Sequence, residues 1–507
     1  MRSEPTIESL LASARGDAVA LLAPDALPLT YDGLRGLVGK TIAALNKYGI
    51  GRDDRVAIVL PNGAEMATTF IAVASGATSA PLNPAYRLDE FEFYMSDLRA
   101  EAVIVEQGSV SPAIEAAHRL GIAVLHSTPD PEQGAGGFTL SGGHEGLASR
   151  PGPAGRDDIA LILHTSGTTS RPKIVPLSQR NVVTSAANIA GTLEFTESDR
   201  GLKIMPLFHI HGLVAGLLAP LSRGSSVYCT PGFNALKFFA WLDEVKPTWY
   251  TAVPTMHQAI LARAPRNAEI VARNRLRFIR SSSSSLPPQV LRELEAMFGV
   301  PVIESYGMTE AAHQMASNPL PPAPRRPGSV GLAAGPEIAI MDAAGALLAP
   351  GAVGEVVIRG PNVTRGYENN PQANEGAFSH GWFRTGDQGV IDDAGYLTLT
   401  GRLKELINRG GEKISPREVD EILLDHPAVE QAVTFALPHD KLGEDVAAAV
   451  VLRDGKTVDE RGLRDFCATR LADFKVPRKI VFLAEIPKGA TGKLTRIGLA
   501  EKLGLTP

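Results

Sequence analysis

Short apolar runs alternate along this chain with longer amphipathic stretches, and the alternation restricts the folds that it can adopt. The runs at residues 55–63, 101–108 and 121–127 each end in a turn signal, which is typical of buried strands. Stretches between them, such as residues 66–77, have helical character. Strands that alternate with helices predict an α/β architecture with largely parallel strands.

The pattern changes twice in the second half of the chain. Residues 354–360 and 395–401 alternate like antiparallel or half-exposed strands. The segment that follows carries two helices and three strand-like runs, the composition of a separate α+β unit of about a hundred residues. We therefore expect a large N-terminal domain, residues 1–403, and a small C-terminal domain, residues 404–507.

Two local predictions follow from turn and cap residues. Thr128 to Asp157 contains eight glycines and four prolines, so it is expected to be a loop or a connection. Ser415 and Glu418 have the spacing of a capping box at the start of a helix.

Composition excludes several classes of protein. Of the 507 residues, 44% are apolar and 21% are charged, which is close to the average of soluble globular proteins. The formal net charge is −5 without a long basic run, so we expect no nucleic-acid partner. No run of 18 or more apolar residues predicts a membrane span. Cys229 and Cys467 have no metal-ligand spacing. Together with the absence of a signal peptide and of a Ser-Lys-Leu ending, this favours a cytoplasmic protein.

Residues 164–173, HTSGTTSRPK, directly follow a predicted strand. Small hydroxyl residues around Gly167 let backbone N–H groups and side chains surround an anion, and Lys173 adds a mobile charge. A Walker loop would need a glycine before the lysine and a serine or threonine after it, and the sequence has Pro172 and Ile174. The segment is therefore either a phosphate-binding loop of another kind or a simple Ser/Thr-rich turn.

Five serines stand in a row at residues 281–285, between an apolar pair and an amphipathic segment. A serine run is typical of a solvated linker. The alternative is a wall of hydroxyls that a polar ligand requires.

The loop resembles the phosphate-binding loop TSGTTGxPK of the adenylate-forming enzymes, which include acyl-CoA synthetases, firefly-type luciferases and nonribosomal adenylation domains. Ser170 replaces the usual second glycine, and we expect ATP binding to survive this change. Four further signatures of the superfamily follow in order: YGMTE (306–310), RTGD (384–387), GRLKELI (401–407) and PKGATGK (487–493). The resemblance covers essentially the whole chain. It implies the adenylate-forming enzyme fold, with layered α/β subdomains and a small mobile lid domain.

The resemblance also implies a reaction and a set of site residues. An acid attacks the α-phosphate of ATP to give an acyl adenylate and pyrophosphate, and coenzyme A then displaces AMP. Glu310 is the expected Mg²⁺ ligand with Thr165 close by, and Thr309 is expected to contact the α-phosphate. The expected ATP-binding residues are Thr165, Ser166, Gly167, Thr168, Thr169, Lys173, Tyr306 near adenine, Asp387 and Arg402 at the ribose, and Lys493.

Two halves of one reaction imply a moving domain. Lys404 matches the hinge position of the superfamily. Lys493 is expected to act in adenylation and then to be withdrawn, while Gly410 and Gly411 approach the pantetheine of coenzyme A.

The serine run indicates which kind of acid the chain would bind. Many relatives have a smooth wall such as SGAAPL at this position, and unpaired buried hydroxyls would cost about 1–3 kcal/mol each. Hydroxyls suit an acid that brings its own hydrogen-bond acceptors. The segment 205–212 carries His209 and His211 where relatives carry one histidine, and His313 follows Glu310 by three residues. These histidines and the serines together predict a site for a second carboxylate.

Five segments of the sequence resemble the oxalate–CoA ligase family: TSGTTSRPK, MPLFHIHGL, WYTAVPTMHQ, RFIRSSSSSL and NRGGEKISP. The resemblance assigns Ser283 and His313 to the oxalate site, with His209 or His211 beside them, and His209 among the catalytic residues. Malonate or another short acid remains an alternative substrate, and so does a carrier protein loaded in trans. A non-catalytic ATP-binding sensor is the alternative from another class. The presence of Lys493, Glu310 and Asp387 together argues against it.

Overall fold

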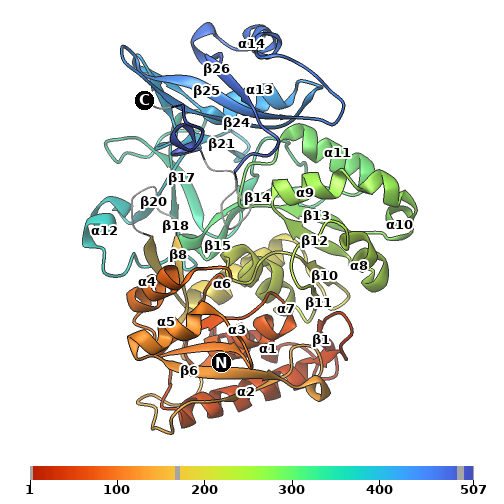
Figure 1. Cartoon of the computed structure of the whole chain (residues 1–507), viewed down its shortest axis with the longest axis vertical. Helices are drawn as coiled ribbons and strands as arrows, with labels where there is room; N and C mark the ends of the chain where they lie inside the picture. The colour runs from red at the N-terminus through yellow and green to blue at the C-terminus, as the bar shows by residue number, and fades with distance from the viewer. Residues whose placement is uncertain (1–3, 166–171, 488–495, 506–507) are drawn as a thin grey trace.

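The computed structural model describes residues 4–165, 172–487 and 496–505 of the chain. Four β-sheets organise these residues, two of them large and central to the N-terminal part. Figure 1 shows the chain running from the first sheet at the bottom to the last sheet, in blue, at the top. Among the described residues no helix is long and apolar enough to cross a membrane. The fold class predicted from the sequence, α/β with a small α+β C-terminal part, is confirmed.

The first sheet has seven strands in the order β7-β6-β5-β3-β4-β8-β9. All neighbours are parallel except the pairs β6–β7 and β8–β9 at its edges. The strands are β3 Arg55–Val59, β4 Thr78–Pro81, β5 Ala102–Glu106, β6 Ala123–Pro129, β7 Phe138–Ser141, β8 Ile159–Thr165 and β9 Lys173–Ser178.

The second sheet has nine strands in the order β16-β15-β14-β13-β12-β10-β11-β1-β2. Its centre, from β14 to β1, is parallel, so the carboxyl ends of these strands meet at one edge. The strands are β1 Val19–Leu22, β2 Leu29–Thr30, β10 Arg200–Lys203, β11 Ser226–Cys229, β12 Trp249–Ala252, β13 Phe278–Ser281, β14 Val302–Met308, β15 His313–Ser317 and β16 Leu332–Ala333.

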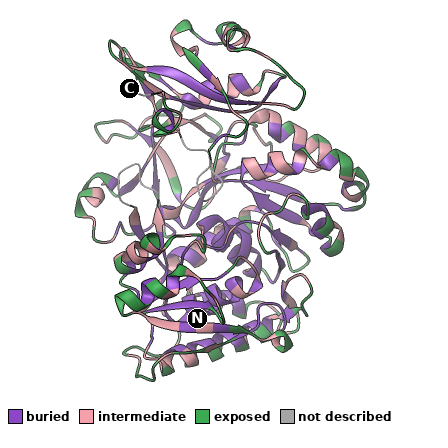
Figure 2. Cartoon of the chain, viewed as in Figure 1, coloured by how far each residue is buried: buried purple, intermediate pink, exposed green. Residues whose placement is uncertain are grey.

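Helices fill the space between the two large sheets. α3 (Ala64–Gly76) contacts β3 and β8 of the first sheet and β11 of the second, and nearly all of its residues are buried. α6 (Gln179–Thr192) likewise contacts strands of both sheets. The core between the sheets is continuous, with Phe70 and Ile189 fully buried in the same apolar cluster. Figure 2 shows this interior as a largely buried layer.

Apart from α7, whose residues are all buried, the remaining helices lie further out, and their exposed sides are visible in Figure 2. α5 and α11 are strongly amphipathic, with a buried stripe towards the sheets. These helices are α1 Ile7–Ala12, α2 Tyr31–Lys47, α4 Leu88–Leu98, α5 Pro112–Leu120, α7 Ala219–Leu221, α8 Phe238–Val245, α9 Pro254–Leu261, α10 Ala268–Arg273, α11 Pro288–Phe298, α12 Pro371–Ala377 and α15 Leu499–Lys502.

Two smaller sheets follow. The third is antiparallel, as expected for residues 354–360 and 395–401, and comprises β17 Glu337–Met341, β18 Val353–Arg359, β19 Phe378–Ser379, β20 Trp382–Ile391 and β21 Leu397–Arg402. The fourth packs against α13 (Pro416–Leu424) and α14 (Glu460–Ala468). It comprises β22 Ile407–Arg409, β23 Glu412–Ile414, β24 Val429–His439, β25 Gly443–Leu452 and β26 Lys479–Phe482. We keep the domain boundary at 403/404 as a proposal, since it falls between β21 and β22.

Two local predictions are wrong. Within Thr128–Asp157, residues Phe138–Ser141 form β7 and extend the first sheet, because Phe138 is buried and the segment pairs with β6. The capping box at α13 is absent. The Ser415 hydroxyl donates to the Thr400 carbonyl, and the Glu418 carboxylate accepts from Lys475 at 2.7 Å, so tertiary partners take both side chains.

Candidate functional site

The residues predicted to bind the acid follow the carboxyl ends of β10, β13 and β14. Ligands of open α/β sheets bind at this edge, because loops and helix starts meet there. The segment that covers this edge is η2 (His211–Leu218), a π-helix. Short π-helical turns are rare and are frequent at functional sites.

The serine run is an ordered turn, and its five hydroxyls have different surroundings. Ser281 and Ser282 are buried, and the Ser282 hydroxyl donates to the Ser305 carbonyl at 3.0 Å. Ser284 and Ser285 are exposed. The run is therefore not a linker, and Ser283 lies at the transition between buried and exposed residues.

Ser283 has a backbone φ of 72°, a conformation that non-glycine residues rarely adopt. Its Oγ lies 3.0 Å from Nδ1 of His211. Nε2 of the same imidazole lies 2.6 Å from the Thr251 hydroxyl, at the end of β12. The strained turn thus holds the Ser283 hydroxyl against a histidine that is fixed from its other side.

The third member of this cluster, Arg280, is one that sequence reasoning missed. Arg280 precedes the serines on β13 and has no exposed surface. Its Nη1 lies 3.4 Å from Nε2 of His211 and 3.2 Å from Nε2 of His313, and its Nη2 donates to Oε1 of Gln314 at 3.3 Å. An arginine at the end of an otherwise apolar strand was the only signal in the sequence.

His313 starts β15 and is buried, and its ring stacks on that of His211 with 4.9 Å between the centroids. His209 is half-buried, and its Nδ1 accepts from the backbone N–H of His211 at 3.3 Å. The structure therefore brings the predicted Ser283, His211 and His313 together, and His209 adjoins them. We call Arg280, His211, Ser283 and His313 the acid half of the site.

A second group lies along β14 and β20. The Tyr306 hydroxyl donates to the Asp387 carboxylate, which also pairs with Arg402 Nε at 3.1 Å. Burial, and secondly the Asp387 charge, raise the pKa of the Tyr306 phenol well above its usual value, so the hydroxyl stays a donor. The Asp387 carboxylate is thereby held in place by Tyr306 and by Arg402.

Glu310 lies in the short turn η4 (Thr309–Ala311), which places Thr309 half-buried beside it. Its carboxylate accepts from the Tyr367 hydroxyl at 2.8 Å, and the Lys173 ammonium lies 4.2 Å from the centre of the Tyr367 ring. Burial raises the pKa of Glu310. Burial first, and then the nearby Lys404 charge, lower the pKa of Lys173, which places the predicted hinge residue near the phosphate-loop lysine.

We call this second group the nucleotide half: Tyr306, Asp387, Arg402, Glu310, Tyr367 and Lys173. The two halves are joined directly, because β14, η4 and β15 run in sequence from Tyr306 to His313. An acid bound at Ser283 and a nucleotide bound at Asp387 would therefore contact the same short segment.

The donor set suits a magnesium ion. Glu310 offers a buried carboxylate and Thr165 a hydroxyl at the end of β8, and Mg²⁺ takes such oxygen ligands together with substrate phosphates and water. A buried carboxylate with a raised pKa is stabilised by a cation beside it. Within the described residues no cluster of three His, Cys, Asp or Glu side chains forms an all-protein metal site.

Other predicted residues lie elsewhere or outside the described ranges. Ser166, Gly167, Thr168, Thr169 and Lys493 lie outside the described residues. Gly410 and Gly411 form the tight turn between β22 and β23, where φ values of 61° and 100° favour glycine.

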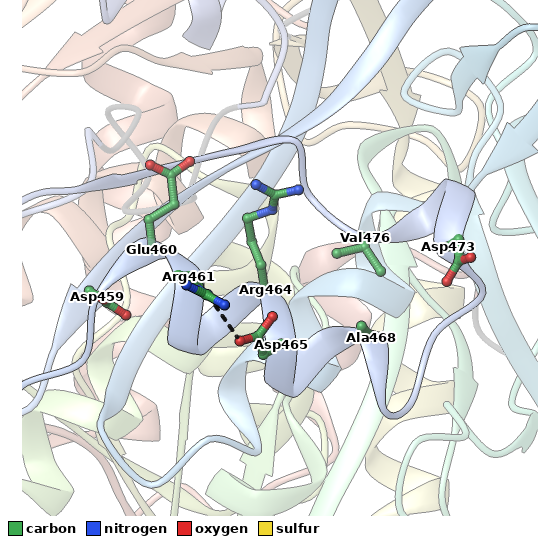
Figure 3. A pocket seen from close by; sticks show the side chains of 8 residues that line it. All are labelled: Asp459, Glu460, Arg461, Arg464, Asp465, Ala468, Asp473 and Val476. Carbon is green, nitrogen blue, oxygen red and sulfur yellow. Dashed lines mark ion pairs between the residues drawn. The ribbon is translucent and has the colours of Figure 1, made fainter.

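A surface hollow lies on the C-terminal part, beside α14 (Figure 3). It is lined mainly by charged side chains, among which Arg461 and Asp465 pair at 3.8 Å. None of the predicted site residues lines it, so it is separate from both halves.

The chain is similar to known proteins over nearly its whole length. Residues 11–368 match the AMP-binding enzyme family, and residues 418–493 match the AMP-binding enzyme C-terminal domain. An oxalate–CoA ligase of Arabidopsis thaliana is 46% identical, over 95% of this chain and 94% of that protein. An oxalate–CoA ligase of Saccharomyces cerevisiae is 41% identical, over 96% and 94%. The structure of ATP-bound MatB from Rhodopseudomonas palustris is 30% identical, with a TM-score of 0.88 over 98% of this chain and 99% of that one.

Proposed function

The chain belongs to the AMP-binding enzyme family, and from this premise we propose that it is an AMP-forming acid–CoA ligase that converts oxalate, ATP and coenzyme A to oxalyl-CoA, AMP and pyrophosphate. The proposal of oxalate as the substrate depends on one observation, the contact of 3.0 Å between Ser283 Oγ and His211 Nδ1, beside His313. A hydrophobic tail would offer no hydrogen-bond acceptor to these polar groups, whereas a second carboxylate supplies acceptors.

Adenylation brings a carboxylate to a phosphate, and two unit charges 4 Å apart repel by about 4 kcal/mol at an effective dielectric near 20. Bound magnesium would offset part of this repulsion, held by Glu310 and Thr165. Lys173 and the loop from Thr165 to Thr169 would hold the β- and γ-phosphates. Asp387, fixed by Tyr306 and Arg402, would accept from the ribose hydroxyls.

At the reacting centre, Thr309 and Lys493 would contact the α-phosphate, and Lys493 would stabilise the charge that develops in the transition state. His209 would stand next to the acid, two residues before the buried start of η2. Ser283, His211 and His313 would hold the far carboxylate, so that the near carboxylate faces the phosphorus.

Thioester formation then needs a different arrangement of the small domain. We propose that rotation at Lys404 withdraws Lys493 and brings Gly410 and Gly411 to the pantetheine. Lys493→Ala should abolish adenylation and still convert supplied oxalyl adenylate to the thioester. Equal loss of both half-reactions would contradict domain alternation.

Oxalate has no carbon between its carboxylates, so the acid half must be short and rich in donors. Sites built to hydrogen-bond a polar group reject analogues that lack it by roughly 10⁴- to 10⁵-fold, whereas one methylene is worth about 1–3 kcal/mol. Malonate is therefore the nearest competitor, and acetate and fatty acids should be rejected strongly.

One assay tests the proposal: pyrophosphate release with and without coenzyme A, for oxalate, malonate, glyoxylate, acetate, octanoate and coumarate. Oxalate should have the highest kcat/KM and should give oxalyl-CoA. A clear preference for another acid would contradict the substrate, and no turnover with any acid would favour an ATP-binding sensor.

We also propose the cytoplasm as the compartment. Cys229 on β11 and Cys467 on α14 are both buried free thiols, which suits a reducing environment.

A further inference from the structure

Arg280 is a buried cation with no carboxylate partner among the described residues. Its guanidinium touches two imidazoles and one amide, and no acceptor among the described residues meets its Nε. Gln314 turns its oxygen towards Arg280 because its amide nitrogen donates to Thr192 and to the Ala334 carbonyl, each at 3.1 Å. No carboxylate of the described chain pairs with Arg280, and a buried charge without a counter-charge is strongly unfavourable.

A second buried cation stands in the same row of the sheet. Lys203 on β10 is the register partner of Thr251 on β12, and Thr251 is the register partner of Arg280 on β13, so the three side chains share one face. The Lys203 ammonium is buried and donates to Asn62 Oδ1 at 3.1 Å. Burial lowers the pKa of Lys203 to about 8 and that of Arg280 to about 9, so both carry their charge at neutral pH. The face beneath η2 is therefore positive before any substrate binds.

The contact between Arg280 and His211 fixes the position of a proton. A guanidinium only donates hydrogen bonds, so Nε2 of His211 must present its lone pair. The neutral ring then carries its proton on Nδ1, and this N–H donates to Ser283 Oγ. Because Ser283 accepts from the ring, its own O–H is free to donate to a ligand.

We propose that Arg280 is a positioning residue that selects dianionic acids, by fixing the His211 tautomer and by placing an uncompensated positive charge behind Ser283. The inference rests on the proposed function and names what recognises the second carboxylate. The second carboxylate of a short dicarboxylate accepts a hydrogen bond from the Ser283 hydroxyl. Its negative charge also offsets the buried charge of Arg280, with the ring of His211 between the two groups. A monocarboxylate of the same length supplies only the reacting carboxylate, so it gains much less from Arg280.

The tautomer is measured without any substrate. In protein labelled with ¹⁵N-histidine, the nitrogen shifts distinguish a protonated nitrogen from one with a lone pair, and His211→Gln identifies the signal by its loss. The proposal requires a neutral His211 with the proton on Nδ1 at pH 7. A proton on Nε2, or on both nitrogens, would overturn it even if every Arg280 variant proved unstable.

The second measurement is kinetic, with Arg280→Met, Arg280→Lys and the exposed Arg275→Met as a matched control. A hydrogen bond to a charged group is worth about 10- to 100-fold, so Arg280→Met should lower kcat/KM for oxalate by about that factor and for glyoxylate by less than about threefold. In Arg280→Met the KM for ATP should stay within about twofold of the parent value. In Arg275→Met all of these kinetic constants should stay within about twofold.

Arg280→Lys keeps the charge but loses the fork that reaches two imidazoles, so oxalate use should lie between that of the parent and that of Arg280→Met. Equal losses for oxalate and glyoxylate in Arg280→Met would show a merely structural residue and overturn the proposal. If the parent used neither oxalate nor any dicarboxylate, the proposed function would fall, and the tautomer measurement would still decide the role of Arg280.

Discussion

The two halves of the site treat buried charge in opposite ways. In the nucleotide half, Asp387 lies between a phenol and the Arg402 guanidinium, and Glu310 lies between the Tyr367 hydroxyl and the neighbourhood of Lys173. Every charge there has an opposite charge or a strong donor nearby. In the acid half, Arg280 contacts two imidazoles and one amide, and no carboxylate of the described residues pairs with it.

This difference matches what each ligand brings. ATP arrives with a metal cation that neutralises part of its charge, so a site whose own charges are already paired can accept it. A small dicarboxylate arrives as a bare dianion, and the buried Arg280 gives it a counter-charge. The nucleotide half should therefore affect all acids alike, and the acid half should affect dicarboxylates alone.

The largest expected effect tests the common role of the nucleotide half. Glu310→Gln removes the carboxylate that would hold magnesium, and loss of one such stabilising group costs about 10²- to 10³-fold in kcat. The loss should be equal for oxalate and glyoxylate in a pyrophosphate-release assay. Circular dichroism should show a folded variant, and a loss confined to oxalate would break the comparison.

The next effect concerns Glu304, a buried acid on β14 that accepts from the Leu286 backbone N–H at 3.2 Å at the end of the serine run. Burial raises its pKa from 4.5 to about 7, with Arg417 of α13 opposing the shift. Between these two values the unfolded chain has lost a proton that the folded chain keeps. The free energy of unfolding should therefore fall as pH rises from 4.5 to 7, by up to about 3 kcal/mol.

Glu304→Gln should remove this fall. Urea denaturation of both proteins at pH 4.5, 7 and 8 measures it: the parent should lose most of this stability relative to the variant between pH 4.5 and 7, with only a small further relative change at pH 8. Parallel stability curves for the two proteins would show that Glu304 is not the group responsible.

A smaller effect tests the selectivity of the acid half. Ser283→Ala removes the donor to the second carboxylate, and a hydrogen bond to a charged group is worth about 1.5–3 kcal/mol. We expect kcat/KM for oxalate to fall about 10- to 100-fold with an unchanged KM for ATP. Ser284→Ala is the matched control, since Ser284 is exposed, and equal losses in both variants would remove Ser283 from the site.

The sequence predicted the elements that depend on local pattern. The strand at Arg55–Val59 and the helix at Ala64–Gly76 are visible as an apolar run and a helical stretch, because burial on both faces leaves a continuous signal. The motifs at Tyr306 and Asp387 were found by their wording, and the structure places these two side chains in contact.

What could not be predicted depends on tertiary contacts. From the sequence, Arg280 would be read as a solvated surface charge. Its burial becomes apparent only from the structure, where it lies in a row of register partners across three strands. The residue pattern alone does not tell which of the five serines meets His211. The resemblance indicated Ser283, and the positive φ of Ser283 is the local feature that sets it apart from the other four. The capping box failed for the same reason, since Ser415 found a closer partner in Thr400.

The smallest expected effect concerns Arg402, whose side chain is 45% exposed where it pairs with Asp387. Exposed ion pairs are worth about 0.2–1 kcal/mol, so Arg402→Gln should raise the KM for ATP by no more than about fivefold. Tyr306 still donates to Asp387 in this variant, which keeps the carboxylate oriented. Measuring the KM values for ATP and for oxalate in the same variant tests whether the two halves are independent. Because the two halves are balanced separately, the oxalate KM should stay within about twofold of the parent value. A rise in the oxalate KM that equals the rise for ATP would mean that the halves share one charge balance, and the distinction between them would fail.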